Sequence, residues 1–244
     1  HLRFGDVPIN SPYLVSTPDF VACHVTPYLH KYDMLHGLVD GGTFLLNSIY
    51  DEERTLREIP NHMKKYMADH NINFYTINAT KIAEEIGLGS RTNTIMQSAF
   101  FKVSGVIPFE QAKDEMKKFI LKSYGSKGEK IITMNNLAVE HGEDVVKVEI
   151  PADWKNVEVV VKAEVEDLAI PSFVRNVAMV IDAQKGDLLP VSAFTGREDG
   201  TLPAGTAAYE KRGIAVNVPE WQSENCIQCN QCAFVCPHAA IIPI

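Results

Sequence analysis

Four cysteines crowd into one short stretch near the C-terminal end of the chain. Cys226, Cys229, Cys232 and Cys236, with Pro237 directly after them, give the spacing C-x2-C-x2-C-x3-C-P. In bacterial ferredoxins, thiolates at this spacing hold [4Fe–4S] clusters: the first three bind one cluster, and the fourth binds the other cluster of a pair. The run therefore predicts iron–sulfur electron transfer, with these four thiols as the metal ligands.

A second run of this kind does not follow, so Cys226, Cys229 and Cys232 lack the fourth ligand that it would supply. We therefore expect the chain to be cut from a longer polypeptide, with any cluster in this piece incomplete or absent. A structural zinc site is the alternative, but zinc ligands usually come as two separated C-x2-C pairs. Cys23 lies in an apolar run and is predicted to be a small buried side chain. His238 is predicted to be a surface or packing residue rather than a ligand.

Composition limits the classes of protein that remain. The chain has 244 residues, 45% of them hydrophobic, and a formal net charge of −8. An acidic chain argues against a nucleic-acid partner, because phosphate binding needs clustered Lys and Arg. There is no apolar run near the ~18 residues of a membrane span and no signal-peptide pattern. Four crowded cysteines do not suit a secreted disulfide framework, so we expect a cytoplasmic protein without a membrane partner.

Alternating strand and helix patterns precede the cysteines and predict how the rest of the chain folds. Short apolar runs bounded by turn residues predict strands at 20–23, 43–46 and 73–77. Helical spacing predicts helices at 60–69, 81–86, 92–102, 108–124 and 128–139. Strands separated by helices favour a layered α/β domain with a largely parallel sheet.

Local signals refine the ends and faces of these helices. Thr80 is predicted to cap the helix at 81–86, which Gly87 would end, and Gly125 is predicted to stop the helix at 108–124. The lysines of that helix are predicted to form a solvated face with their acidic neighbours. They are Lys113, Lys117 and Lys118, beside Asp114 and Glu115. From Gly186 to Glu220, dense Gly and Pro without a helical period predict an extended connecting arm.

Longer motifs along the chain resemble those of one enzyme family. They are HLRFGDVPINSPYL, DFVACH, KYDML, GGTFLLNS, GLGSRTNTIMQSAFFK, LPVSAFTGREDGTLPAGTAAYEKRGIAVNVPEW and ENCIQCNQCAFVCPHAAI. With these motifs the chain resembles pyruvate:ferredoxin (flavodoxin) oxidoreductase over essentially its whole length. The resemblance implies a large multidomain homodimer that converts pyruvate and coenzyme A to acetyl-CoA and CO₂ with thiamine pyrophosphate. Its electrons would leave through [4Fe–4S] clusters to ferredoxin or flavodoxin.

The same resemblance implies a domain layout. Residues 1–185 would be the gamma domain, also called domain III, without its opening. Residues 186–220 would be a connecting segment, and 221–244 the start of a two-cluster ferredoxin domain. Thiamine pyrophosphate and its Mg ion would belong to other domains of the same polypeptide. We therefore assign no catalytic residue and expect the chain alone to be inactive.

A coenzyme A contribution from the gamma domain is also implied by the resemblance. Asn47, after a predicted strand, and Arg91, before a predicted helix, are the candidates on the coenzyme A side, with the Gly41-Gly42 turn as a further polar feature. Glycine turns and helix N-termini suit anions. The alternatives stay open: Asn47 caps the next segment, Arg91 pairs with a surface carboxylate, and Gly41-Gly42 is only a tight turn.

Two other classes of function also remain at this point. One is a stand-alone electron carrier or adaptor with a single cluster, and the other is an interaction domain whose cysteines are idle. A parent reading frame that continued with a second C-x2-C-x2-C-x3-C-P run would exclude the carrier.

Overall fold

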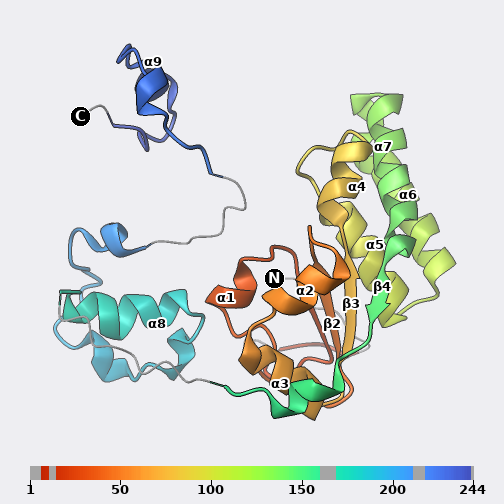
Figure 1. Cartoon of the computed structure of the whole chain (residues 1–244), viewed down its shortest axis with the longest axis horizontal. Coiled ribbons are helices and arrows are strands. Elements are labelled where there is room, and N and C mark those ends of the chain that lie inside the picture. The colour runs from red at the N-terminus through yellow and green to blue at the C-terminus, as the bar shows by residue number, and fades with distance from the viewer. Residues whose placement is uncertain (1–6, 11–14, 160–168, 211–217, 243–244) are drawn as a thin grey trace. The chain divides into compact units, whose positions relative to one another are not determined.

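A layered α/β body accounts for residues 15–159 of the computed structural model, which describes residues 7–10, 15–159, 169–210 and 218–242 (Figure 1). Its four described strands form one sheet in the order β1-β2-β3-β4. β1 (Phe20–Cys23), β2 (Thr43–Asn47) and β3 (Asn73–Ile77) run parallel, and β4 (Val146–Val148) is antiparallel to β3. The predicted layered α/β fold with a largely parallel sheet is confirmed.

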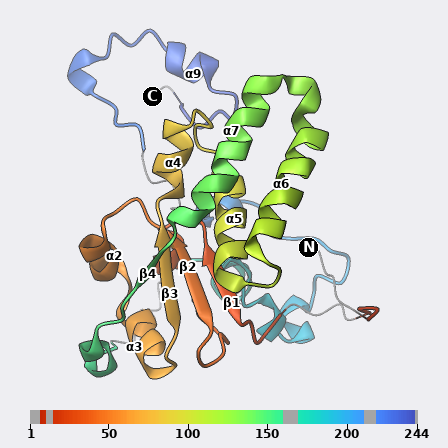
Figure 2. The same ribbon diagram turned by 90° about the vertical axis from the view of Figure 1, so that its right-hand side faces the viewer.

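Helices cover both faces of this sheet, as Figure 2 shows for α2 and α3 on one side and α5 and α6 on the other. The first layer consists of α1 (Tyr28–Lys31), α2 (Glu52–Glu58) and α3 (Asn61–Asp69). The second consists of α4 (Ala79–Glu85), α5 (Asn93–Ser104), α6 (Phe109–Tyr124) and α7 (Glu129–Glu140). The sheet is therefore the middle layer of three.

β2 shows why both faces must be covered. Phe44 and Leu46 pack with Leu29 and Met63 in one apolar core, whereas Leu45 belongs to the other core with residues of α4 and α5. Successive side chains of a strand point to opposite faces, so a strand buried on both sides is a continuous apolar run. Residues 43–46 (TFLL) are apolar in this way, so the strand could be predicted from the sequence.

The predicted elements are confirmed, with ends that move by a residue or two. The strand predicted at 43–46 extends to Asn47, and the predicted helices correspond to α3, α4, α5, α6 and α7. The sequence carries no clear signal for α1, α2 or β4, which are all short.

One predicted helix end is wrong. Thr80 does not cap α4: Oδ1 of Asn78 accepts a hydrogen bond from the backbone N–H of Lys81 at 2.9 Å, and the helix begins at Ala79. Gly125 does end α6 as predicted, since it is the C-cap residue after Tyr124, and with a φ of −54° it begins a 3-10 turn, η1 (Gly125–Lys127). The turn ends at Gly128, whose φ of 94° lies in the left-handed region that favours glycine.

The lysine face predicted to be solvated is only partly so. Nζ of Lys113 lies 2.9 Å from Glu143, 3.0 Å from Glu110 and 3.4 Å from Glu140, and its side chain is only 12% exposed. Lys117 also pairs with Glu140. α6 and α7 pack side by side, so Glu140 at the end of α7 and Glu143 in the 3-10 turn that follows, η2 (His141–Asp144), meet these lysines. Lys118, paired with Glu115 on its own helix, keeps the predicted exposed position.

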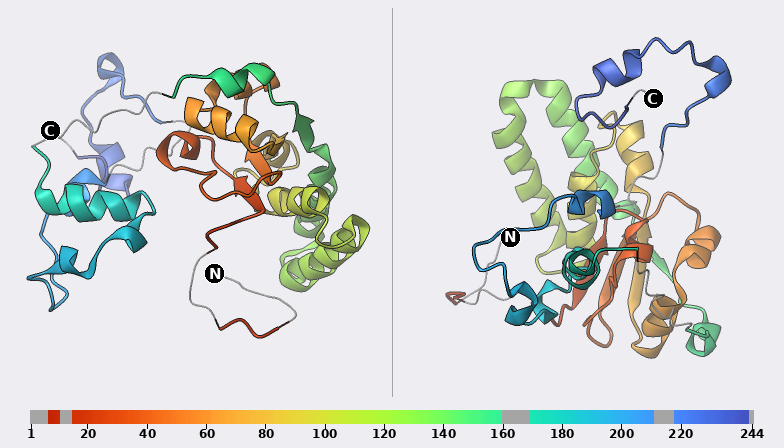
Figure 3. Two further views of the ribbon diagram at one scale, coloured as in Figure 1. Left: turned by 90° about the horizontal axis from the view of Figure 1, so that it is seen from below. Right: turned by 90° about the vertical axis from the view of Figure 1, so that its left-hand side faces the viewer.

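Residues 169–210 form a short helix and an irregular arm that returns to it (Figure 3). The helix comprises η4 (Val174–Ala178) and α8 (Met179–Asp182), and the arm contains η7 (Thr206–Tyr209). An apolar cleft of about 250 Å³ lies between them, lined by side chains that include Val177, Phe194 and Leu202. The described residues 186–210 of the predicted arm are irregular as expected, but they fold back on the preceding helix and are not extended, and residues 211–217 lie outside the described residues.

In the part of the chain that the structure describes, no helix is both long enough and apolar enough to cross a membrane.

Candidate functional site

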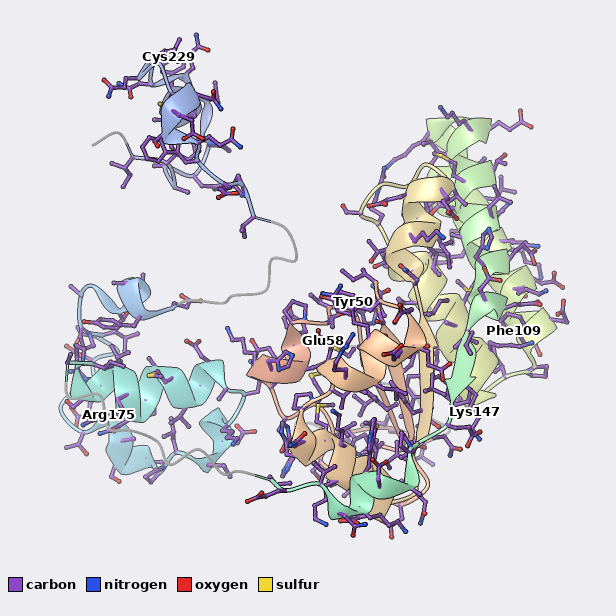
Figure 4. The ribbon with its side chains drawn as sticks, in the orientation of Figure 1. Tyr50, Glu58, Phe109, Lys147, Arg175 and Cys229 are labelled. Atoms are coloured by element: carbon purple, nitrogen blue, oxygen red, sulfur yellow. The ribbon has the colours of Figure 1, made fainter. Side chains whose placement is uncertain are left out.

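The cysteine run lies in a compact unit, Ala215–Ile244, that is separate from the preceding unit, His1–Ile214. Its described residues contain a 3-10 turn, η8 (Ser223–Asn225), and a short helix, α9 (Gln231–Val235). Gln228 and Asn230 have φ values of 55° and 57°, in the left-handed region that non-glycine residues seldom adopt. These two residues bend the chain sharply on either side of Cys229, which Figure 4 labels.

The four thiols of the run are free and accessible. Cys226, Cys229 and Cys232 are exposed, and Cys236 is half-buried. The indole N–H of Trp221 and the backbone N–H of Gln228 lower the pKa of the Cys226 thiol. Hydrogen-bond donors aimed at a sulfur favour the thiolate, which is the form that binds metal.

Cys236 receives the same kind of support from the residues that follow it. Backbone N–H groups, those of His238 and Ile241 foremost, lower the pKa of its thiol. The N–H of Ala240 lies 3.3 Å from Cys236 Sγ. The turn after Pro237 therefore surrounds this sulfur with donors.

The donor set fits an iron–sulfur cluster. It offers four thiols at ferredoxin spacing, with N–H donors on two of the sulfurs, and soft thiolates are the usual ligands of such clusters. Within the described residues, no three His, Cys, Asp or Glu side chains converge on a common point. The assignment of these thiols as cluster ligands therefore depends on their spacing and on the N–H donors near the sulfurs, and not on a preformed metal site.

Apolar residues around the thiols are exposed in this unit. Ile227, Phe234 and Val235 are 83%, 92% and 71% exposed. Within the described part of this unit they are open to water, because too few residues surround them to form a core. Shielding would need further polypeptide packed on this face.

Asn47 occupies a different place, at the carboxyl end of β2, and its side chain is 5% exposed. Its Nδ2 donates to the carbonyl of His24 at 3.0 Å and to Oγ1 of Thr80 at 3.2 Å. Its Oδ1 accepts from the backbone N–H of Ala79 at 3.0 Å. The amide thus ties the end of β1 and the first turn of α4 to β2, and its role toward coenzyme A stays a prediction.

The other two polar candidates lie elsewhere. Arg91 is exposed in the loop between α4 and α5, where its Nε donates to the carbonyl of Leu88 at 3.1 Å. Gly41-Gly42 precedes β2 and so lies at the opposite end of this strand from Asn47. A Cβ on Gly42 would lie 2.8 Å from the carbonyl oxygen of Val39, as expected of a tight turn. The structure therefore does not bring the turn and Asn47 together.

Sequence reasoning missed several groups that contact the candidate residues. Trp221 and Ala240 act on the sulfurs through an indole and a backbone N–H, and both lie outside the C-x2-C-x2-C-x3-C-P run. His24, whose carbonyl accepts from Asn47, is also partly desolvated, which lowers the pKa of its imidazole. The signal for His24 was its position directly after a predicted strand.

Comparison with known families divides the chain into three parts. Residues 1–145 match a family described as pyruvate ferredoxin/flavodoxin oxidoreductase. Residues 161–215 match a domain of unknown function, and residues 218–241 match a 4Fe-4S binding domain. The second match runs across residue 186, where we expected a connecting segment to begin, and the expected boundaries stay predictions.

Curated relatives align with the chain from end to end. A pyruvate-flavodoxin oxidoreductase of Enterobacter agglomerans is 51% identical over 100% of this chain and 21% of its own length. A pyruvate:ferredoxin oxidoreductase of Moorella thermoacetica is 50% identical over 100% of this chain and 20% of its own length. The chain therefore spans about a fifth of the length of these relatives.

Among solved structures, the chain is similar to a pyruvate oxidoreductase subunit PORC of Thermotoga maritima. The identity is 24% and the TM-score 0.44, over 55% of this chain and 67% of that one. The family assignment depends on the sequence matches instead. Since the first of the three family matches covers more than half of the residues, the chain belongs to the pyruvate ferredoxin/flavodoxin oxidoreductase family.

Proposed function

We propose that this chain is the part of a pyruvate:ferredoxin or flavodoxin oxidoreductase that carries the gamma domain and the first ligands of its [4Fe–4S] clusters. The observation that carries the proposal is the thiol run from Cys226 to Cys236, in a segment that matches a 4Fe-4S binding domain. The intact enzyme would oxidise pyruvate in the presence of coenzyme A and form acetyl-CoA and CO₂.

Each cysteine has a proposed role. Cys226, Cys229 and Cys232 would hold one cluster, and Cys236 would hold the other. Such clusters, when bound, accept and release single electrons. The protein's own contribution is to hold the thiolates, through the donors on Cys226 and Cys236, with Pro237 fixing φ where the turn over Cys236 begins.

Thiamine pyrophosphate and Mg would be held by other domains of the polypeptide, so no residue of this chain is given a part in breaking the carbon–carbon bond. Crowded free thiols persist in a reducing compartment, so the proposed location is the cytoplasm. Ferredoxin or flavodoxin would be the acceptor, as the names of the relatives suggest, and a homodimer is the proposed assembly.

A role for the α/β body on the coenzyme A side is the second element of the proposal. The guanidinium of Arg91 is exposed and could meet a phosphate of coenzyme A. Asn47 would act indirectly, by holding the ends of β1 and β2 and the start of α4. In the intact enzyme, Arg91→Ala should raise the KM for coenzyme A and leave thermal stability unchanged. Lys81→Ala, which removes an exposed cation from α4, is the matched control and should change neither.

The proposed activity is tested with the intact polypeptide and this chain side by side. Pyruvate-dependent reduction of viologen, assayed without oxygen and with coenzyme A present, should occur with the intact polypeptide only. Reduction by this chain alone would show that the thiamine site had been assigned to the wrong domains. No reduction by an intact polypeptide with its clusters bound would count against pyruvate as the substrate.

A further inference from the structure

The chain turns back on Cys236 directly after Pro237. The backbone N–H of Ala239 donates to the carbonyl of Cys236 at 3.3 Å and closes the turn. The next N–H, that of Ala240, then donates to Cys236 Sγ at 3.3 Å. The sulfur of Cys236 therefore has a hydrogen-bond donor that is fixed by the fold of its own segment.

Ala239 holds this arrangement in an uncommon backbone conformation. Its φ is 49°, in the left-handed region. For an alanine this region costs roughly 1–2 kcal/mol, because Cβ approaches the following carbonyl oxygen, and glycine or asparagine usually takes such positions. Strained backbone of this kind tends to lie at functional sites. Here its consequence is plain: the left-handed turn at Ala239 aims the N–H of Ala240 at the sulfur.

We propose that the Ala239–Ala240 turn tunes the reduction potential of the cluster that Cys236 ligates, with the N–H of Ala240 as the tuning group. The inference rests on the proposed function, since it takes Cys236 to be a cluster ligand. When one electron enters the cluster from a reductant, negative charge increases on the sulfur ligands. An N–H donor stabilises that charge, so it favours the reduced form and raises the potential. Ala240 is a positioning residue in this scheme, because it acts through Cys236.

Ala240→Pro removes the donor, since proline has no backbone N–H. In the intact polypeptide we expect the equilibrium constant for one-electron reduction of a single cluster to fall roughly threefold to tenfold, which is about 28 to 59 mV. A redox titration followed by electron paramagnetic resonance measures the shift, and the other clusters serve as internal standards. Ala239→Gly is the matched control: it keeps the N–H of Ala240 and suits the left-handed conformation, so the potential should stay unchanged.

Proline at position 240 also restricts the residue before it, and the turn could be lost with the donor. A second variant avoids this difficulty. Replacing Ala240 by L-lactic acid, through nonsense suppression, exchanges the N–H for an ester oxygen and keeps the methyl group. The same negative shift in this variant supports the inference.

An unchanged potential in the ester variant, with the cluster still bound, overturns the inference. Loss of that cluster from the ester variant overturns it too, because the N–H would then hold the ligand in place rather than tune it. Iron and sulfide analysis of the unmodified polypeptide keeps the two proposals distinct. If the unmodified polypeptide holds no cluster, it is the proposed function that fails.

Discussion

Asn47→Ala is the substitution whose cost can be worked out most fully from the structure. The amide is 5% exposed and makes hydrogen bonds to the carbonyl of His24, the hydroxyl of Thr80 and the N–H of Ala79. Truncation leaves a backbone carbonyl and a backbone N–H without these partners. Each buried polar group left unsatisfied costs about 1–3 kcal/mol, so for the two groups we expect a loss of about 2–6 kcal/mol in the free energy of unfolding.

Urea unfolding of the chain, followed by the fluorescence of the buried Trp154 and by circular dichroism, measures this loss. The midpoint should move to lower urea with little change in slope, because the variant exposes the same surface when it unfolds. Asn93→Ala is the matched control: Asn93 is exposed in the first turn of α5, and its loss should change stability by less than about 0.5 kcal/mol. If Asn47→Ala also changed the free energy of unfolding by less than about 0.5 kcal/mol, the view that its amide ties the strand ends together would be refuted.

Three further outcomes are expected. Burial raises the pKa of the Cys23 thiol from 9.0 to about 11, so the native chain should lose about 2–3 kcal/mol of stability as pH rises between these values, and Cys23→Ala should lack this loss. A disulfide reagent should also label Cys23 only after unfolding. The ammonium of Lys117 lowers the pKa of the Glu140 carboxyl, so its stabilisation is present above the ordinary value of 4.5 and fades below it. Glu140→Gln should therefore be less stable than the unmodified chain near neutral pH, with the difference shrinking in acid; a constant difference would contradict the ion pair. Gly142→Ala places a Cβ 2.1 Å from Oγ of Ser98 and should cost about 1–3 kcal/mol, whereas Gly125→Ala, where a Cβ meets nothing within 4 Å, should be neutral in thermal unfolding.

The central part of the fold could be predicted because its signals are local. β2 is a continuous apolar run between turn residues, and α6 repeats its apolar side chains at helical steps. α2 has the sequence EERTLRE, with Leu56 as its single apolar residue, so no period marks it. β4 has only three residues and exists because it pairs with β3, and such pairing cannot be read from spacing alone.

Some features of the candidate site could likewise be predicted from the sequence, and others could not. The thiol ligands were visible because their chemistry and spacing lie within one segment. The donor at Ala240 was not, since any residue can offer a backbone N–H and only the φ of Ala239 aims it at a sulfur. The network of Asn47 was also beyond the sequence, because it forms where two strands and a helix meet.

Iron and sulfide analysis of the intact polypeptide, purified without oxygen, tests the central claim most directly. Cys229→Ser should remove roughly one [4Fe–4S] cluster per chain, because it takes one of the three thiolates of a cluster. Cys23→Ser, which alters the buried thiol of β1, should leave the iron content unchanged. Iron and sulfide at the unmodified level in the Cys229→Ser protein, or their absence from the unmodified protein, would contradict the account.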